Sequence, residues 1–518
     1  MSASYASVAK GEVHLHDKAI DALNEQKVVE ESKNTVLVSG AGLVGSLAAI
    51  YLAKRGYNVE VYEGRPDSRN LEGQQGRSIN LALSNRAFRA LGGVDKQIIE
   101  EVHNIGVKMF GRYIHLKNGQ NTFQPYGRQD QYILSVSRGF LNEYLMTKAE
   151  QLPNVKLHFE DKITGMNLSL NDGTIKVQTK TGTERRVKLV IGSDGVHSVV
   201  RQVMQEYGKA RFQYLQQYVP HGYKELTLQA GPNNKFLMRS DSLHIWPRGD
   251  FLLIALPNRT GDFTCTVFMR MKHDEKYEDS PSFDRLDTDD KVVRFISTEF
   301  PDFYQLAGKE RILHDWHSNP TSGLMHVKCD PYHFKDKCVL LGDSAHAIIP
   351  FYGQGVNCGF EDVYILDEMF KKYEKEGIGK VLSMYTQVRK PSCDAISDLS
   401  KLNFIEMSSK TASYSFLLKN KIGNLLHRLM PDRYLPLYTM VTFTPEMSYA
   451  TAWSTHLRRE KTVAKVTHVS AWLILIGGLY AVYRYVKSVA MSPPQNTQWR
   501  RLIDYIWYVL RNVINKLF

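Results

Sequence analysis

A glycine-rich turn between an apolar strand and an apolar helix limits this chain more than any other feature. The stretch TVLVSGAGLVGSLAAIYLAKRGYNVEVYEGR, residues 35–65, reads as a strand, a Gly-x-Gly-x-x-Gly turn, a helix and a second strand. Gly40 permits the tight turn, Gly42 lets the backbone approach a pyrophosphate, and Gly45 lets the helix pack against the strand. This unit predicts an α/β fold that binds a dinucleotide at a helix N-terminus.

An acidic residue closes the second strand of this unit. Glu63 lies 18 residues after Gly45, where a carboxylate can accept hydrogen bonds from a ribose. Because strand, turn, helix, second strand and acid follow in order, the stretch predicts nucleotide binding more firmly than glycine spacing alone. It leaves open which dinucleotide is bound.

Two later strand-turn-helix stretches decide between the dinucleotides. KLVIGSDGVHSVVR (188–201) resembles the Asp-Gly motif of the flavoprotein aromatic hydroxylase family, and CVLLGDSAHAIIP (338–350) resembles its Gly-Asp motif. The resemblance implies that Asp343 bonds the ribityl chain of FAD. It also implies that the next helix begins under the flavin ring, with its N–H groups facing developing negative charge. The backbone beneath the ring is then expected to come from Gly353, Gly355, Val356 and Asn357.

Longer strings narrow the resemblance within that family. They are GRSINLALS (76–84), PYGRQDQYILSVSR (125–138), QQYVPHGYKEL (216–226), LHIWPRG (243–249) and PLYTMVTF (436–443). They are similar to the kynurenine 3-monooxygenase family, and the similarity runs from about residue 35 to residue 451. It implies hydroxylation of L-kynurenine to 3-hydroxy-L-kynurenine with NADPH and O2, through a flavin C4a-hydroperoxide, in tryptophan degradation towards NAD biosynthesis.

Four residues are expected to hold the substrate. Kynurenine carries a carboxylate that must leave water, and a planar guanidinium with hydroxyl neighbours suits that group. The resemblance places this role on Arg112 of GRYIH and Tyr126 of QPYG, with further polar contacts from Asn403 of KLNFIEM and Tyr438 of PLYTM. From the residues alone, Arg112 beside Tyr113 would instead be read as part of a solvated strand face.

The resemblance also assigns the FAD contacts. No catalytic residue of the protein is expected, because the flavin carries the chemistry and the ring amine of the substrate activates the carbon. No second βαβ unit follows, so NADPH is expected to visit a surface groove. No metal is expected. The expected FAD-binding residues are Gly40, Gly42, Leu43, Val44, Gly45, Tyr62, Glu63, Arg65, Arg77, Ala82, Arg138, Ile163, Asp194, Gly342, Asp343, Gly355, Val356 and Asn357.

The basic net charge is concentrated at the C-terminus. Residues 419–518 hold 14 Lys/Arg and 4 Asp/Glu, so they supply +10 of the total +12 and leave +2 for residues 1–418. This distribution argues against a nucleic-acid partner. The five cysteines show no C-x-x-C pair and no zinc spacing, which favours a reducing compartment.

The C-terminus is expected to be a membrane anchor. Residues 466–483 lack Asp, Glu, Lys and Arg and are flanked by basic residues, which favours a short span over a buried helix. Residues 499–518 predict an amphipathic helix that lies on a membrane or, alternatively, folds back onto the catalytic domain. A tail of this kind resembles the family's anchor in the mitochondrial outer membrane, with the active site facing the cytosol.

The expected architecture is a Rossmann-like, para-hydroxybenzoate hydroxylase-like FAD domain with an inserted β-sheet substrate domain. The expected parts are a disordered tail (1–33), the FAD domain (34–110, 130–215 and 325–395), the substrate domain (111–129 and 216–324), a helical cap (396–457) and the anchor region (458–518).

Two other functions stay open. One is an NADPH-dependent flavin hydroxylase of another aromatic acid, and the other is a silent, membrane-tethered flavoprotein scaffold.

Overall fold

The computed structural model describes residues 32–70, 80–278, 280–408 and 434–490, together with Arg501, Tyr505 and Tyr508. Residues 1–452 form one compact unit and residues 453–518 form a second. Several expected features lie outside the described residues: Arg77, nearly all of the N-terminal tail, residues 409–433 of the cap, and most of the amphipathic helix expected at 499–518.

A six-stranded sheet in the first unit contains the glycine-rich turn. Its order is β18-β19-β12-β1-β2-β8, and all neighbours are parallel except β18 and β19. β1 is apolar because a central parallel strand is covered on both faces, and Val36–Val38 are fully buried. The strands are β1 (Thr35–Ser39), β2 (Asn58–Tyr62), β8 (Val155–His158), β12 (Leu189–Gly192), β18 (His333–Phe334) and β19 (Cys338–Leu340).

A seven-stranded sheet, in the order β17-β13-β16-β15-β14-β5-β6, is the second large element. Its alternating residues pack on α7 (Asp289–Glu299), α8 (Pro301–Ala307) and α9 (Lys309–Ser318), around a core that includes Trp246 and Phe263. The strands are β5 (Gly111–His115), β6 (Asn121–Pro125), β13 (Gln213–Leu228), β14 (Ser242–Pro247), β15 (Leu252–Pro257), β16 (Phe263–Arg270) and β17 (Ser322–Asp330).

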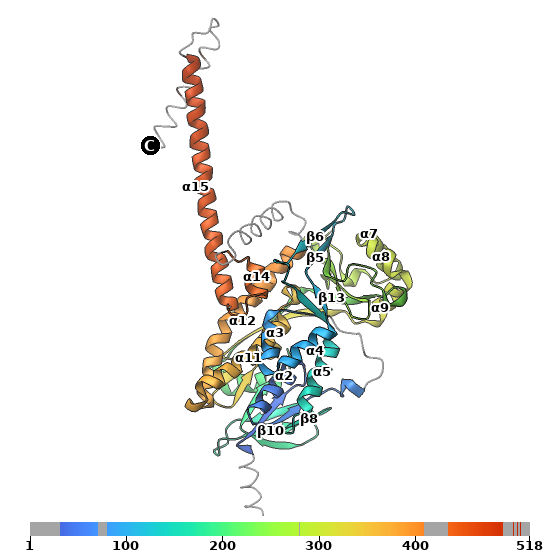
Figure 1. The fold of residues 1–518 in the computed structure, drawn as a ribbon, viewed down its shortest axis with the longest axis vertical. Helices are drawn as coiled ribbons and strands as arrows, with labels where there is room; N and C mark the ends of the chain where they lie inside the picture. The colour runs from blue at the N-terminus through green and yellow to red at the C-terminus, as the bar shows by residue number, and fades with distance from the viewer. Residues whose placement is uncertain are drawn as a thin grey trace, which may run out of the picture. The chain divides into compact units, whose positions relative to one another are not determined.

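Two three-stranded sheets and a group of helices complete this unit. α11 packs against α2, α3 and α12, and Figure 1 shows α2, α3 and α11 side by side. The small sheets are β3 (Leu81–Leu83), β7 (Ile133–Val136) and β4 (Val107–Met109), and β11 (Glu184–Val187), β10 (Ile175–Thr179) and β9 (Ile163–Asn167). The helices are α2 (Leu43–Lys54), α3 (Asn85–Val94), α4 (Lys96–Ile105), α5 (Arg138–Glu150), α6 (Val199–Gly208), α10 (Asp343–His346), α11 (Gly355–Tyr373), α12 (Ile378–Ser408) and α14 (Leu437–Thr442).

The last long helix, α15 (Tyr449–Ala490), covers the segment 466–483. The structure gives the expected membrane span no support: among the described residues, no helix is both long enough and apolar enough to cross a membrane. Several side chains of this segment lie outside the description.

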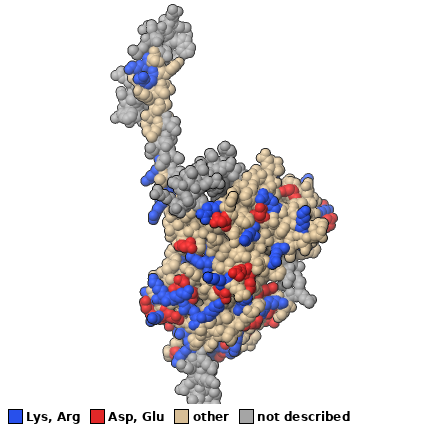
Figure 2. Space-filling view, viewed as in Figure 1, with Lys and Arg blue, Asp and Glu red and all other residues tan. Residues whose placement is uncertain are grey.

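Charged side chains of both signs cover the first unit. Figure 2 shows lysines and arginines intermixed with aspartates and glutamates on the face in view. This face therefore has no broad surface of a single sign, in keeping with the near balance of charge in residues 1–418.

Candidate functional site

A cavity of about 720 Å³ lies where the carboxyl ends of β1, β2 and β12 face the seven-stranded sheet. Its volume is in the range of about 300–1,000 Å³ that is typical of ligand pockets. Residues far apart in the sequence line it, from Ser39 at the end of β1 to Tyr438 on α14. The carboxyl edge of a parallel sheet is where α/β proteins bind nucleotides.

The glycine turn forms one end of this cavity. Gly40 has a φ of +94°, which favours glycine. A Cβ on Gly45 would lie 1.9 Å from the Gly40 carbonyl oxygen, so only glycine lets α2 approach the strand. A Cβ on Gly42 would meet nothing within 4 Å, because this position faces the open cavity. The turn therefore has the shape that a pyrophosphate needs.

Glu63 lies beside the turn with a pKa below its usual range. Its Oε2 accepts a hydrogen bond from the Ala41 N–H at 3.0 Å, and its Oε1 accepts from Arg65 Nε at 2.9 Å. Burial alone would raise the pKa of Glu63, but these hydrogen bonds and the charge of Arg65 lower it. Glu63 is thus an anionic acceptor at the end of β2, where a ribose is bound in such units.

Two aspartates of the later motifs line the middle of the cavity. Asp194 Oδ2 accepts from the Val199 and Val200 N–H groups at 2.8 and 3.2 Å, whereas its buried Oδ1 has no hydrogen-bond partner among the described residues. Asp343 is exposed to the cavity, opposite Arg138. The protein around the cavity removes bulk water and raises the pKa of both carboxyl groups. Both aspartates are placed to bond a polar ligand.

The glycines before α11 form a second open wall. Gly353 has a φ of +66°, and a Cβ on Gly355 would meet nothing within 4 Å. Gly355 and Val356 line the cavity, but Asn357 does not. The Asn357 amide instead donates to the carbonyl oxygens of Ala82 and Gly353, each at 2.8 Å. Asn357 therefore joins β3 to the start of α11 and leaves the backbone of that helix facing the cavity.

An arginine and three tyrosines gather at the end of the cavity nearest the seven-stranded sheet. The guanidinium carbon of Arg112 lies 4.9 Å from the ring centre of Tyr438 and 6.0 Å from that of Tyr126. Tyr438 stacks on Tyr126 at 5.1 Å and on Tyr352 at 5.8 Å. Burial raises the pKa of Tyr126 and of Tyr438, so both hydroxyl groups stay protonated as hydrogen-bond donors. This cluster offers a cation and flat apolar rings to one ligand.

Tyr126 and Asn403 lie behind the cavity wall. Neither side chain lines the cavity, although Tyr126 contacts Tyr438, which does. The Asn403 amide donates to the Phe351 carbonyl oxygen at 2.6 Å, and Phe351 lines the cavity. Asn403 thus supports the wall, and its direct contact with the substrate stays a prediction.

Sequence reasoning missed a buried arginine that holds the helix of Tyr438. Arg86 is fully buried and donates to the carbonyl oxygens of Val441 and Met447, each at 2.6 Å. Its other nitrogen pairs with Glu361 on α11 at 2.6 Å. Arg86 therefore joins α14 to the helix that begins at the cavity. An arginine among apolar residues directly after the string GRSINLALS was the only available signal.

The expected FAD-binding residues fall into three groups. Most of them line the cavity, while Gly45 and Asn357 lie beside it and Arg77 is outside the described residues. Strand register, which the sequence does not give, adds apolar residues: β5 pairs with β14 so that Leu243 lies opposite Arg112. The cavity-lining residues that we expected are Gly40, Gly42, Leu43, Val44, Tyr62, Glu63, Arg65, Ala82, Arg138, Ile163, Asp194, Gly342, Asp343, Gly355 and Val356.

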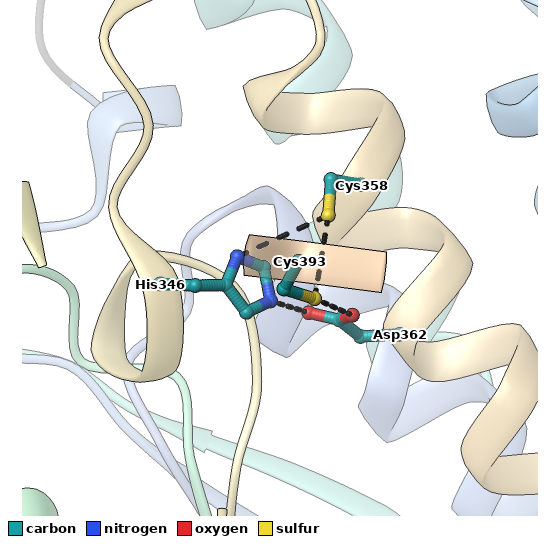
Figure 3. Close-up of side chains that lie close together, drawn as sticks. All are labelled: His346, Cys358, Asp362 and Cys393. Carbon is teal, nitrogen blue, oxygen red and sulfur yellow. Dashed lines mark hydrogen bonds and ion pairs between the residues drawn. The ribbon is translucent and has the colours of Figure 1, made fainter. Parts of the chain in front are cut away.

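A second polar cluster brings together side chains from α10, α11 and α12 (Figure 3). His346, Cys358, Asp362 and Cys393 are all buried, and one ligand-type atom from each lies within 4.8 Å of the others. His346 Nε2 contacts Asp362 Oδ2 at 2.6 Å. None of the four lines the cavity. His346 is therefore held in an ion pair away from the ligand space.

Comparison with known proteins identifies the family of this chain. A model of the FAD-binding domain family matches residues 33–400. Kynurenine 3-monooxygenase of Sus scrofa is 42% identical over 414 residues, which cover 80% of this chain and 84% of that protein. The chain belongs to the kynurenine 3-monooxygenase family.

A second relative supports this family, and a solved structure shares the fold. Kynurenine 3-monooxygenase of Flavobacterium johnsoniae is 43% identical over 421 residues, 80% of this chain and 90% of that protein. The crystal structure of P. aeruginosa PqsL in complex with 2-aminobenzoylacetate has a TM-score of 0.58 at 20% identity, over 74% of this chain and 99% of that one. The expected FAD-binding monooxygenase fold of the α/β class is confirmed.

Proposed function

We propose that the protein hydroxylates L-kynurenine to 3-hydroxy-L-kynurenine, with FAD as cofactor and NADPH and O2 as co-substrates. One observation carries the proposal: the Arg112–Tyr438 cluster opens into the same cavity as the nucleotide turn and the α11 N-terminus. A substrate carboxylate bound by Arg112 would therefore lie in one chamber with the ring of a flavin. Relatives that are named kynurenine 3-monooxygenases support this substrate.

The residues present fit FAD along the length of the cavity. The open position at Gly42 and the N–H groups of α2 suit the pyrophosphate, and Glu63 suits the adenosine ribose. Asp343 suits the ribityl hydroxyls, and the open backbone at Gly355 suits the edge of the ring system. When bound, FAD takes electrons from NADPH and activates O2 for transfer of one oxygen atom.

The protein's own contribution is to bind and orient the substrate. Arg112 would hold the carboxylate by charge-assisted hydrogen bonds, and the protonated hydroxyl group of Tyr438, which lines the cavity, would donate to the same group. The Tyr126 hydroxyl is buried and has no hydrogen-bond partner within the described part of the chain. Tyr126 lies behind Tyr438, so it would act on the substrate by orienting Tyr438 and Arg112, which it contacts.

Apolar side chains surround the place where the aryl ring would lie. They exclude water, which protects reactive oxygen species in such sites from unproductive decay. We assign no general base, because the aromatic amine of the substrate activates the carbon that accepts oxygen. The apolar wall consists of Leu243, Ile254, Leu256, Phe268 and Phe351.

NADPH consumption by detergent-solubilised protein, with and without L-kynurenine, tests the proposal. We expect stimulated consumption and a product that is heavier by one oxygen atom. Replacement of Arg112 by alanine should lower kcat/KM about 10- to 100-fold, since hydrogen bonds to charged groups contribute about 1.5–3 kcal/mol. Arg239→Ala is the matched control, because Arg239 is an exposed arginine that pairs with Asp241 outside the cavity.

The other two functions give different results in the same assay. A hydroxylase of another aromatic acid would consume NADPH with kynurenine but release only H2O2. A silent scaffold would bind FAD and show no NADPH turnover with any aromatic acid. Either result would refute kynurenine hydroxylation.

We further propose that the C-terminal unit attaches the enzyme to a membrane, which for this family we take to be the mitochondrial outer membrane. Large apolar side chains of α15 support this, because Trp472, Leu473, Tyr480 and Tyr485 are each more than half exposed. Basic residues on both sides suit anionic lipid. Flotation with anionic vesicles tests attachment, and a Trp472→Glu/Leu473→Glu variant that floats as well as the unchanged chain would refute it.

A further inference from the structure

Two of the five cysteines meet in the cluster of His346, Cys358, Asp362 and Cys393. Cys358 Sγ and Cys393 Sγ are 3.8 Å apart and belong to the neighbouring helices α11 and α12 (Figure 3). Cys265, Cys329 and Cys338 are also buried, and no other sulfur–sulfur contact occurs among the described residues, which include all five cysteines. The pair is therefore the one place in this chain where neighbouring thiols are already close.

The surroundings of the pair favour one thiolate and one thiol. Arg389 Nη2 lies 3.2 Å from Cys358 Sγ, and His346 Nδ1 lies 3.9 Å from the same atom. Cys393 Sγ lies 3.9 Å from Asp362 Oδ1. Burial and the charge of Asp362 would raise the pKa of Cys393, but the Cys358 thiol and the charges of Arg389 and His346 lower it to about 6. Burial raises the pKa of Cys358. An attacking thiolate beside a neutral partner is the arrangement that disulfide formation requires.

A metal ion fits the cluster less well. Asp362, the only carboxylate of the cluster, already accepts from Arg389 Nε at 2.8 Å, from His346 Nε2 at 2.6 Å and from the Gly342 N–H at 2.8 Å. Arg389 also contacts Cys358 Sγ. A guanidinium thus supplies the positive charge that a metal would bring, and a metal ion would have to displace it.

We propose that Cys358 and Cys393 are an oxidation site that hydrogen peroxide converts to a disulfide. The source of peroxide rests on the proposed function, since H2O2 forms whenever O2 is reduced without hydroxylation. Cys358 lies within one turn of Gly355, which lines the cavity, so the pair is close to the place where peroxide would form.

The chemistry balances without another reactant. The Cys393 thiolate attacks one peroxide oxygen, an S–O bond forms, the O–O bond breaks, and the departing hydroxide takes a proton to become water. The Cys358 thiol then loses its proton, and its sulfur attacks the Cys393 sulfur. The S–S bond forms, the S–O bond breaks, and a second water leaves. Two thiols lose two electrons and two protons, and one H2O2 becomes two waters.

Disulfide formation would act on the cavity through α11. The sulfur atoms must close from 3.8 Å to about 2.05 Å. We expect the first turns of α11 to shift towards α12 by the part of this change that side-chain rotation does not supply. The same turns begin with Gly355 and Val356 in the cavity wall. Because displacements of about 1 Å in an active site cost up to about 100-fold in rate, we expect at least a 10-fold lower turnover that a dithiol reductant reverses.

Peptide mapping of the full-length holoenzyme tests the site. After treatment with H2O2, tryptic digestion without reduction should give a cross-link between the Cys358 and Cys393 peptides, with the other three thiols unmodified. Fragmentation is needed, because Cys338 and Cys358 share one tryptic peptide. Added peroxide makes the mapping independent of kynurenine turnover, so failure of the proposed function would leave this result intact.

Two variants and one control sharpen the test. Cys393→Ala should abolish the cross-link and the reversible loss of turnover, while Cys265→Ala, which changes an equally buried cysteine, should change neither. In Cys358→Ala, a dione reagent should trap a sulfenic acid on Cys393. Absence of the cross-link at excess peroxide, or equal oxidation of all five thiols, would overturn the inference. One equivalent of tightly bound zinc in the purified protein, with thiols that resist peroxide, would overturn it in favour of a metal site.

Discussion

Replacing Gly42 by alanine should separate cofactor binding from folding. The backbone at Gly42 has φ −71° and ψ 179°, which alanine adopts without strain, and the added Cβ meets no atom of the protein within 4 Å. We therefore expect the apoprotein to be as stable as the unchanged chain, or more stable by about 0.4–1 kcal/mol, because alanine has less freedom in the unfolded state. The new methyl group occupies the space that a pyrophosphate would enter.

The loss of FAD affinity can be estimated from packing. Forcing a methyl group into a filled contact costs about 1–3 kcal/mol, which corresponds to about a 5- to 150-fold weaker Kd. Gly45→Ala is the contrasting variant, since its Cβ would lie 1.9 Å from the Gly40 carbonyl oxygen and 2.6 Å from Ser193 Oγ. That clash is within the protein, so it should destabilise the apoprotein itself.

Two measurements on apoprotein decide the matter: the melting temperature without FAD, and flavin fluorescence during titration with FAD. Gly42→Ala should leave the melting temperature unchanged or slightly higher and weaken binding, whereas Gly45→Ala should lower the melting temperature. If Gly42→Ala bound FAD as tightly as the unchanged chain, the cofactor would not pass Gly42, and the assignment of this end of the cavity would be wrong.

Three further predictions concern substrate binding and the dependence of folding stability on pH. Tyr126→Phe removes a buried hydroxyl that has no partner in the described structure, so thermal stability should hold while KM for kynurenine rises about 5- to 10-fold in steady-state assays. Arg86→Met should raise KM about 10-fold through loosened α14 while FAD affinity stays unchanged, and loss of FAD binding would contradict this role. Burial lowers the pKa of His244 from 6.5 to about 4, so the unfolded chain binds the proton first and stability falls as pH drops from 6.5 towards 4. Between pH 8 and pH 5 this costs about 2 kcal/mol, and urea unfolding of His244→Gln should show a shallower pH slope by that amount.

The sequence predicted those parts of the site whose geometry is local. A strand, three glycines and a helix fix the turn around Gly42 wherever they occur, and Asp194 and Asp343 follow strands whose ends must meet at one sheet edge. Side-chain direction on α11 was not predictable in this way. Asn357 turns towards Ala82 because the tertiary contact between β3 and α11 offers it a carbonyl oxygen.

Features that depend on contacts between distant segments could not be predicted from the sequence. Arg86 is buried because the carbonyl oxygens of Val441 in α14 and of Met447 after it, more than 350 residues later, accept its protons. The apolar wall opposite Arg112 depends on the register between β5 and β14. The thiol pair could not be predicted either, since the spacing of Cys358 and Cys393 suggests no pairing until α11 and α12 pack together. Asn403 fits its expected part of the chain but supports the wall behind the cavity.

The strand order of the six-stranded sheet also determines when, during translation, each strand can pair with its neighbours. β1 needs β12 on one edge, and β12 in turn needs β19, which begins at Cys338. At about 5–20 residues per second, a ribosome takes roughly 15–60 s to pass from β1 to β19. During that time the nascent chain holds an apolar strand with an unpaired edge, which invites pairing with other chains. Because the partner strands are made late, we expect the nascent chain to need chaperones during translation.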